Sequence, residues 1–325
     1  MSRRLAGLAG VPAVAVLVWL LLAGGVAMQS YLGAWLALAA LPLGALSVLM
    51  GLEAAGAADR PIASALRRIL PLMIPAVLAA PVLERSAWPD LPGAWFARDA
   101  FLVRQALVLL AWGLLVLLFA RAPRTRGRRI AGGLGLLVHV ALVTLAATDW
   151  IASLHPGLLP ADLGLVLLSA QSGAAASLAI LLLPAAVRNR DAGRLAVLLT
   201  VLLAVWAFLH FTQFLIVWSA DLPREADWYL ARSGGLGAGA PWLLPASLGV
   251  AVPLLAWRPS VTLAPCAVGL LALHVVEMFW LVTPSLRGRF SITWLDLAAL
   301  LAMAGVAAAL LAVRPGRLAV RHAAP

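Results

Sequence analysis

The chain has 325 residues, of which 64% are hydrophobic and only 11% are charged, and its mean hydropathy is +1.01. A composition this apolar excludes a soluble protein and leaves little chain for extramembrane domains, because each bilayer-spanning helix needs about 20 apolar residues. The net charge of +11 comes from arginines, most of them in short loops between apolar runs, which indicates membrane topology and no nucleic-acid partner.

Apolar runs bounded by charged residues, Pro and Gly predict ten membrane-spanning helices in a single membrane domain. The third is short and contains Pro71, Pro75 and Pro81, so we expect a kinked or broken helix that packs against protein. The first is longer than the core of a signal peptide, so we expect a retained helix. The predicted spans are 5–27, 31–52, 69–83, 100–120, 130–153, 161–187, 195–219, 237–257, 261–283 and 293–313.

The arginines predict how the helices are oriented, because short cytoplasmic loops carry an excess of Lys and Arg. With both termini in the cytoplasm, 17 arginines lie on the inner side and 7 on the outer side. The outer ones are Arg85, Arg98, Arg104, Arg224, Arg232, Arg287 and Arg289. Leaving out the third span would place the clusters at 121–129 and 188–194 outside, so the arginine pattern supports that span.

Cysteine and histidine content limits the cofactors that this chain alone can hold. Cys266 is the single cysteine, which excludes a disulfide framework within the chain, a cysteine-ligated iron–sulfur cluster and a c-type haem attachment site. The three deep histidines, His139, His210 and His274, lie on three separate spans and do not form the facing pairs that bis-histidine haem needs. We therefore expect no metal and no cofactor bound by this chain alone.

Ionisable side chains inside membrane helices are costly and usually face a bundle interior or a water-filled cavity. Here they are Arg104, His139, Asp149, His210, His274, Glu277 and Asp296, most of them in the predicted outer half. His274 and Glu277 are three residues apart, so they share one helix face where the carboxylate can tune the imidazole. His210 and Gln213 have the same spacing.

Each of these residues also has a structural interpretation. Asp149 and Asp296 lie close enough to the predicted outer interface to be solvated or to cap loops, and His139 is interpreted first as a core histidine. The candidates for proton or quinol handling are His274, Glu277, His210 and Asp149. The candidates for lining a pocket are His139, Gln213, Arg104 and Asp296.

Two stretches carry a resemblance to a known family. Residues 149–156 read DWIASLHP, with Gly164 following, and 208–225 read FLHFTQFLIVWSADLPRE. They resemble the DWxxSLxPHW…G and FxxFxQYLxIWYxNxPEE motifs of the ActF-type membrane subunit of alternative complex III, a bacterial quinol:electron-acceptor oxidoreductase. A weaker third match is 274–284, HVVEMFWLVTP. The matches cover spans five, seven and nine in the expected order.

The resemblance implies an NrfD-like subunit of the bacterial inner membrane with ten helices and no cofactor of its own. Two four-helix bundles, 31–153 and 161–283, would be flanked by the peripheral helices 5–27 and 293–313. Its partners would be an iron–sulfur protein, c-type cytochromes and an NrfD-like paralogue. Its role would be quinol oxidation or the proton translocation coupled to it, with quinone or quinol as the bound molecule.

Two other functions remain open on the residues alone. One is a catalytically silent anchor that only holds redox partners at the membrane. The other is a secondary transporter, which is compatible with a proline-broken helix. An apolar pocket with a histidine or a carboxylate suits a quinol headgroup, because two protons leave with the two electrons. His210, His274 and Glu277 could serve such a pocket or a proton outlet.

Overall fold

The described part of the chain is built from helices alone. The computed structural model describes residues 26–80, 97–121, 127–155, 162–234 and 239–313, together with Val14, Val16, Val18 and Trp19. Within these ranges there is no strand, so the predicted all-α class is confirmed. The helices are α2 (Val26–Ala54), α3 (Pro61–Ile69), η1 (Leu70–Leu72), α4 (Met73–Ala79), α6 (Arg98–Phe119), α7 (Arg128–Trp150), η4 (Ala152–Leu154), α8 (Leu163–Leu182), α9 (Ala185–Arg190), α10 (Ala192–Ala220), α11 (Pro223–Ser233), α12 (Ala240–Trp257), α13 (Pro259–Arg287) and α14 (Trp294–Val313).

Eight segments are long and apolar enough to cross a membrane, so the chain is a polytopic integral membrane protein, as predicted. A ninth, shorter apolar stretch, Ala246–Trp257, lies within α12. The predicted first span, 5–27, lies almost wholly outside the described residues, and the total of ten spans stays a prediction. The eight segments are Ala27–Ala54, Pro61–Ala79, Arg98–Phe119, Arg128–Leu154, Leu163–Leu182, Ala192–Ala220, Pro259–Arg287 and Trp294–Ala312.

The third span is broken, and its start was predicted wrongly. A 3-10 turn, η1, contains Pro71 and separates α3 from α4, which confirms the expected interruption by proline. The helix begins at Pro61 and not near residue 69. The prediction began the span after Arg67 and Arg68, because charged residues were taken as the boundary of an apolar run. In the structure Arg67 pairs with Glu53 at the end of α2, at 2.7 Å, so that charge does not end the helix.

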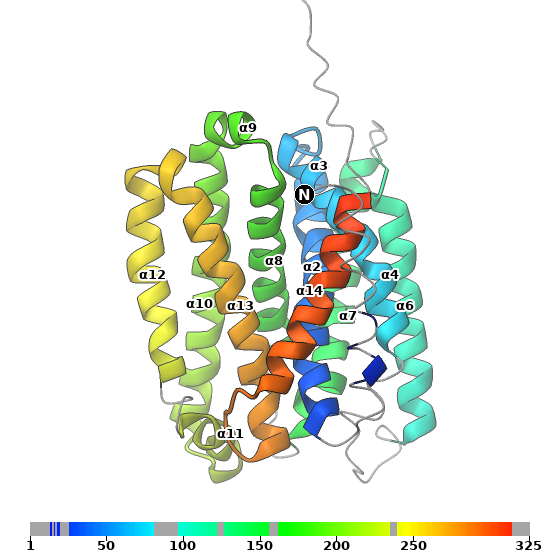
Figure 1. Ribbon diagram of the computed structural model, residues 1–325, viewed down its shortest axis with the longest axis vertical. Helices are drawn as coiled ribbons and strands as arrows, with labels where there is room; N and C mark the ends of the chain where they lie inside the picture. Colours follow the sequence, from blue (N-terminus) through cyan, green and yellow to red (C-terminus); the bar gives the residue numbers. More distant parts are fainter. Residues whose placement is uncertain are drawn as a thin grey trace, which may run out of the picture.

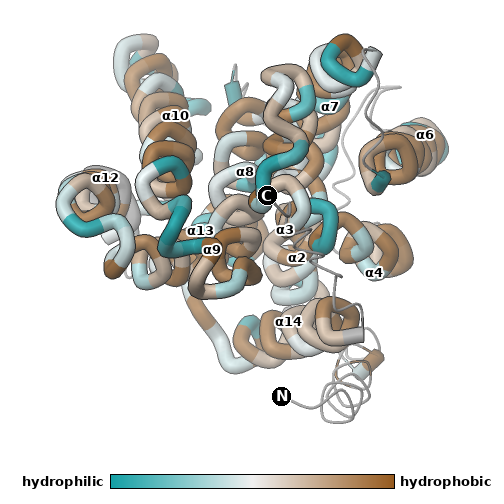
Figure 2. Tube along the Cα trace, turned by 90° about the horizontal axis from the view of Figure 1, so that it is seen from above, coloured by the Kyte–Doolittle hydropathy of each residue, from teal (hydrophilic) through white to brown (hydrophobic). Residues whose placement is uncertain are grey.

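Two central helices, α2 and α8, organise the packing. They form the most extensive helix–helix contact, and both also contact α7 and α13; the view along the helices shows them at the centre with α12 and α6 at opposite margins (Figure 2). Gly44 permits this approach, because a Cβ there would overlap the backbone carbonyl of Gln171. The predicted groups 31–153 and 161–283 therefore share one core, and their division into two bundles stays a prediction.

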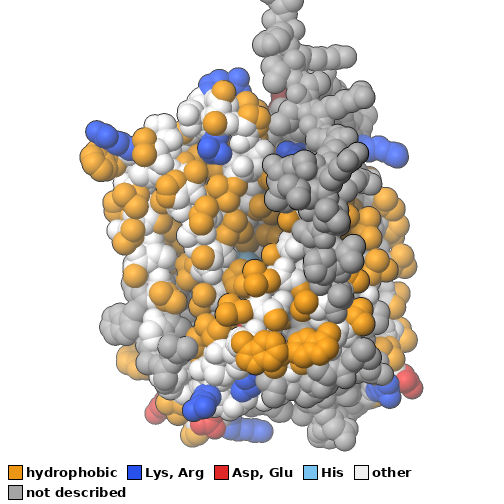
Figure 3. Space-filling model, viewed as in Figure 1, with side chains coloured by type: hydrophobic (Ala, Val, Ile, Leu, Met, Phe, Trp, Pro, Cys, Tyr) orange, Lys and Arg blue, Asp and Glu red, His pale blue; other side chains and the backbone are white. Residues whose placement is uncertain are grey.

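The outer helices present apolar side chains outward, as lipid contact requires. In the most apolar 18-residue stretch of each helix, 83% of the residues are buried in α2 but only 22% in α6. Leu110, Leu117 and Leu137 are among the large side chains exposed on α6 and α7, and Val197 and Val201 among those on α10. Figure 3 shows apolar side chains covering the middle of the molecule and arginines gathered towards its two ends.

Charge differs between the two ends of the helices. The chain alternates in direction from helix to helix (Figure 1), so the described arginines of 60–68, 121–129, 188–194 and 258 lie towards one end. That arginine-rich end has ten described arginines and three carboxylates, Glu53, Asp59 and Asp191. The other end, called the acidic end below, has six described arginines and eight carboxylates: Asp99, Asp149, Asp162, Asp221, Glu225, Asp227, Glu277 and Asp296.

Candidate functional site

The centre of the candidate site is the buried carboxylate of Glu277 on α13. Two neighbours on α10 bond to the same oxygen: the Trp206 indole N–H donates to Oε1 at 2.8 Å, and His210 Nε2 lies 2.7 Å from Oε1. His274 Nδ1 is 3.9 Å from Oε2. The sequence-predicted pair His274 and Glu277 is thus adjacent, but the imidazole that hydrogen-bonds the carboxylate is His210 of another helix.

Helical spacing on α10 explains how two of these side chains reach α13. Trp206, His210, Gln213 and Val217 recur at intervals of three and four residues and are all buried, so they form the face of α10 that packs inward. Gln213 follows His210 on that face, but its Oε1 has no hydrogen-bond partner among the described residues. Gln213 was predicted to line a pocket, but it is not among the residues that line either of the two cavities described below.

A large apolar cavity opens beside His210 and Glu277. Its volume is about 760 Å³, within the range of small-molecule sites in proteins. The walls come from α10, α11, α12 and α13, and they include Phe208, Phe211, Phe214 and Trp280. The polar groups in this wall are His210, Glu277, Tyr229, Arg232, Ser233 and the indole of Trp206. A mostly apolar cavity with a few converging polar groups is typical of a ligand site.

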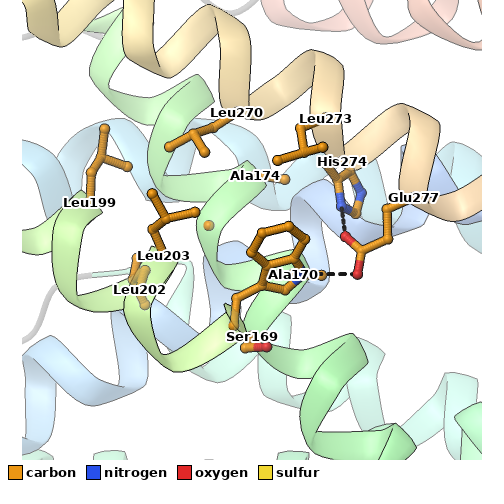
Figure 4. Close-up of a pocket in the computed structure, with 12 residues that line it drawn as sticks. Ser169, Ala170, Ala174, Leu199, Leu202, Leu203, Leu270, Leu273, His274 and Glu277 are labelled. Carbon is orange, nitrogen blue, oxygen red and sulfur yellow. Dashed lines mark hydrogen bonds and ion pairs between the residues drawn. The ribbon is translucent and has the colours of Figure 1, made fainter. Parts of the chain in front are cut away.

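A second, much smaller cavity lies on another side of Glu277. Its volume is about 30 Å³, which is room for about two water molecules. Figure 4 shows it between α8, α10 and α13, with His274 and Glu277 at one end and Leu199, Leu202 and Leu270 at the other. Neither ring nitrogen of His274 has a hydrogen-bond partner among the described residues. A buried imidazole left this way suits a site where a water molecule or a proton is exchanged.

Arg232 is a residue of the cavity wall that the sequence did not predict. It was counted as a loop arginine, yet its side chain is 1% exposed and lines the large cavity. It lies on α11, a helix outside the spans, where Trp228 one turn earlier is also buried. This i, i+4 pair on an otherwise polar helix is the signal that could have identified a buried face. Burial lowers the pKa of the Arg232 guanidinium to about 9.

Asp162 is the second group that the sequence reasoning missed, and it lies just before α8 at the acidic end. Its carboxylate oxygens are buried and accept no hydrogen bond from another described residue. Burial raises the pKa of the Asp162 carboxyl, while its own backbone N–H and a positive charge on His210 act in the opposite direction. The charges of Asp162 and Arg232 both act on the cavity residue Tyr229. Asp162 therefore belongs to the electrostatic surroundings of His210 at that end.

Asp149 and Arg104 form a separate network between α6 and α7. The Arg104 guanidinium donates twice to the carboxylate, at 2.8 and 3.0 Å, and Gln105 donates to it at 3.2 Å. Trp150 then donates to Gln105 Oε1 at 2.7 Å. Every acceptor in this chain of bonds is used by a neighbouring donor, and these residues line neither of the two cavities. Their geometry is that of a structural clamp between two helices.

The remaining predicted residues, His139 and Asp296, also lie away from both cavities. Trp112 donates to His139 Nδ1 at 3.0 Å in a fully buried setting. Asp296 accepts two bonds from Arg287, at 2.8 and 2.9 Å, and one from the backbone N–H of Thr293. Asp296 therefore fixes the turn between α13 and α14, as the loop-capping interpretation expected.

In the described ranges, no group of three or more His, Cys, Asp or Glu side chains is arranged to hold a metal ion. No protein-family model and no curated protein matches the chain.

Proposed function

We propose that this integral membrane protein is a subunit of a quinol-oxidising respiratory complex similar to alternative complex III, and that Glu277 and His210 accept protons from the quinol. One observation carries the proposal: a hydrogen-bonded carboxylate–imidazole pair in the wall of an apolar cavity of about 760 Å³. A quinol needs an apolar cavity for its ring and tail and a proton acceptor for its hydroxyls.

The geometry around Glu277 suits it to receive a proton. An indole N–H can only donate, so Trp206 holds Oε1 as an acceptor. His210 shares a proton with that same oxygen across 2.7 Å. Glu277 also lies in the wall of the large cavity, so in the proposal its carboxylate accepts a hydrogen bond from a quinol hydroxyl there. The neighbouring imidazole can then take up the charge, as general acid–base catalysis requires.

The reaction must release two protons and two electrons for each quinol oxidised to quinone. In the proposal, the electrons pass to partner subunits, an iron–sulfur protein and c-type cytochromes, which assemble with this chain and an NrfD-like paralogue. The protons leave through His210 towards Asp162 at the acidic end. Asp162 suits this step because burial raises the pKa of its carboxyl and its oxygens accept no hydrogen bond from another described residue.

The anchor function is favoured by a different observation. Beyond His274 and Glu277, the wall of the small cavity facing the arginine-rich end is made of Leu199, Leu202 and Leu270, which cannot carry protons. A chain that only held partners would need no such carriers. A quinol-oxidation assay on the purified complex separates the two functions, because only the first makes turnover depend on Glu277. Proton or ion flux without quinol would instead support a transporter.

The proposal places the chain in the bacterial inner membrane with the arginine-rich end in the cytoplasm, following the distribution of short-loop arginines. At Arg129, only a reporter that is active in the cytoplasm should therefore give a signal. At Arg224, only a reporter that is active in the periplasm should do so. Alkaline phosphatase and green fluorescent protein fusions measure this. The reverse pattern at either position would overturn the orientation and the direction of proton release.

A further inference from the structure

The last turns of α13 contain a break in backbone hydrogen bonding next to the site. Pro284 lies inside the helix and has no N–H, so the carbonyl of Trp280 loses the bond that residue 284 would normally donate. Trp280 lies one turn after Glu277 and lines the same cavity. An unpaired backbone carbonyl at this depth is costly, so another donor is needed.

Arg232 of α11 supplies that donor. Its Nε donates to the Trp280 carbonyl at 3.1 Å, and its Nη2 donates to the Leu281 carbonyl at 2.6 Å and to Ser285 Oγ at 3.0 Å. On its own helix, Nη1 donates to the Trp228 carbonyl at 2.8 Å. One guanidinium therefore bridges α11 to three residues in the turn of α13 that contains Pro284.

The charge of Arg232 is balanced by dipoles and ring faces. No carboxylate of the described ranges lies within ion-pair distance of it. Two of its acceptors are carbonyls near the C-terminal end of α13, where the helix dipole is negative. Its Cζ lies 3.7 Å from the centroid of the Trp228 ring and 5.7 Å from that of Trp280, within cation–π range. The carbonyls and rings around this turn of α13 therefore stabilise the buried charge of Arg232.

We infer that Arg232 is a positioning residue of the site: it replaces the hydrogen bond that Pro284 removes, and so fixes the turn of α13 that begins at Trp280 and directly follows Glu277. Through Arg232, helix α11, which lies outside the membrane spans, influences the position of the buried Glu277 carboxylate. The inference rests on the proposed function for the role that it gives Glu277. Its test does not, because the reactivity of Glu277 can be measured without quinol.

A double-mutant cycle tests this inference. Pro284→Ala restores an N–H that can bond the Trp280 carbonyl, so Arg232 should matter less in that background. The probe is dicyclohexylcarbodiimide, an apolar reagent for buried carboxyl groups, and mass spectrometry gives the rate at which Glu277 is modified. Arg232→Met should change this rate at least fivefold with Pro284 present and less than twofold with Pro284→Ala. Arg224→Met, an exposed arginine on the same helix, is the matched control and should leave the rate unchanged.

Each outcome of the cycle decides the inference. An equal effect of Arg232→Met in both backgrounds, or an unchanged rate for Glu277 despite a lower melting temperature, would overturn it and leave Arg232 a general stabiliser. If Arg232→Met assembles only with Pro284→Ala, the inference is supported; if it fails to assemble in both backgrounds, it is rejected. A wild-type complex that does not oxidise quinol would refute the proposed function while leaving this measurement intact.

Discussion

Replacing Glu277 by Gln should lower the rate of quinol oxidation by about 100-fold or more, in the range that general acid–base groups contribute. The glutamine can keep an oxygen for the Trp206 N–H, but it cannot hold a proton. Glu277→Asp should lose less, because it keeps the titrating group and only shortens its reach. The measurement is steady-state quinol oxidation by the purified complex, together with the protons released per electron.

Glu225→Gln is the matched control for this substitution. Glu225 is a partly exposed carboxylate in the first turn of α11, so the same chemical change there should leave turnover within about twofold, as expected for a surface position far from catalysis. If the Glu277→Gln complex assembles and shows unchanged turnover and proton stoichiometry across pH, Glu277 is structural. The membrane anchor would then become the better account of this chain.

Removing the carboxylate of Asp149 should produce the largest loss of stability. Asp149→Ala removes the carboxylate that accepts hydrogen bonds from Arg104 and Gln105, in a setting where the Asp149 side chain is 1% exposed. Breaking a buried pair from one side costs about 3–5 kcal/mol. The expected result is a lower melting temperature in detergent and less assembled protein, with normal turnover for each complex that does assemble.

The double variant Arg104→Met with Asp149→Leu should recover much of this loss, because it removes both charges together. Thermal unfolding of the two single variants and the double variant gives the coupling between the two positions. A loss of turnover per assembled complex in Asp149→Asn, with stability unchanged, would contradict the structural role. That result would support the sequence-based prediction that Asp149 handles protons.

Hydropathy and helical spacing predicted much of this molecule, because both depend on the helix alone. Runs of apolar residues predicted eight spans that the structure bears out, and Pro71 predicted the interruption of the third. Spacing along one helix also placed His274 beside Glu277, at 3.9 Å. The cost of placing charge in a membrane predicted that His210 faces the interior, and it is buried; Asp149, for which a solvated position was left open, is buried as well.

The partners of these residues could not be predicted, because they come from other helices. Nothing in the spacing of α13 indicates that His210 and Trp206 of α10 bind Glu277, or that Arg104 holds Asp149 across two helices. Arg232 was assigned to a loop because charge outside a span usually means solvent. Its burial depends on the carbonyls near Pro284, a requirement that appears only when α11 and α13 are packed together.

Photolabelling tests the central claim most directly, namely that a quinol binds in the cavity beside His210 and Glu277. An azidoquinone that reacts with nearby side chains on illumination should label peptides of α10 and α13, which carry most of the cavity wall. Excess quinol should compete with the label, and Glu277→Gln should weaken it while Glu225→Gln does not. Labelling confined to other helices, or labelling of α10 and α13 that quinol does not reduce, would contradict the account.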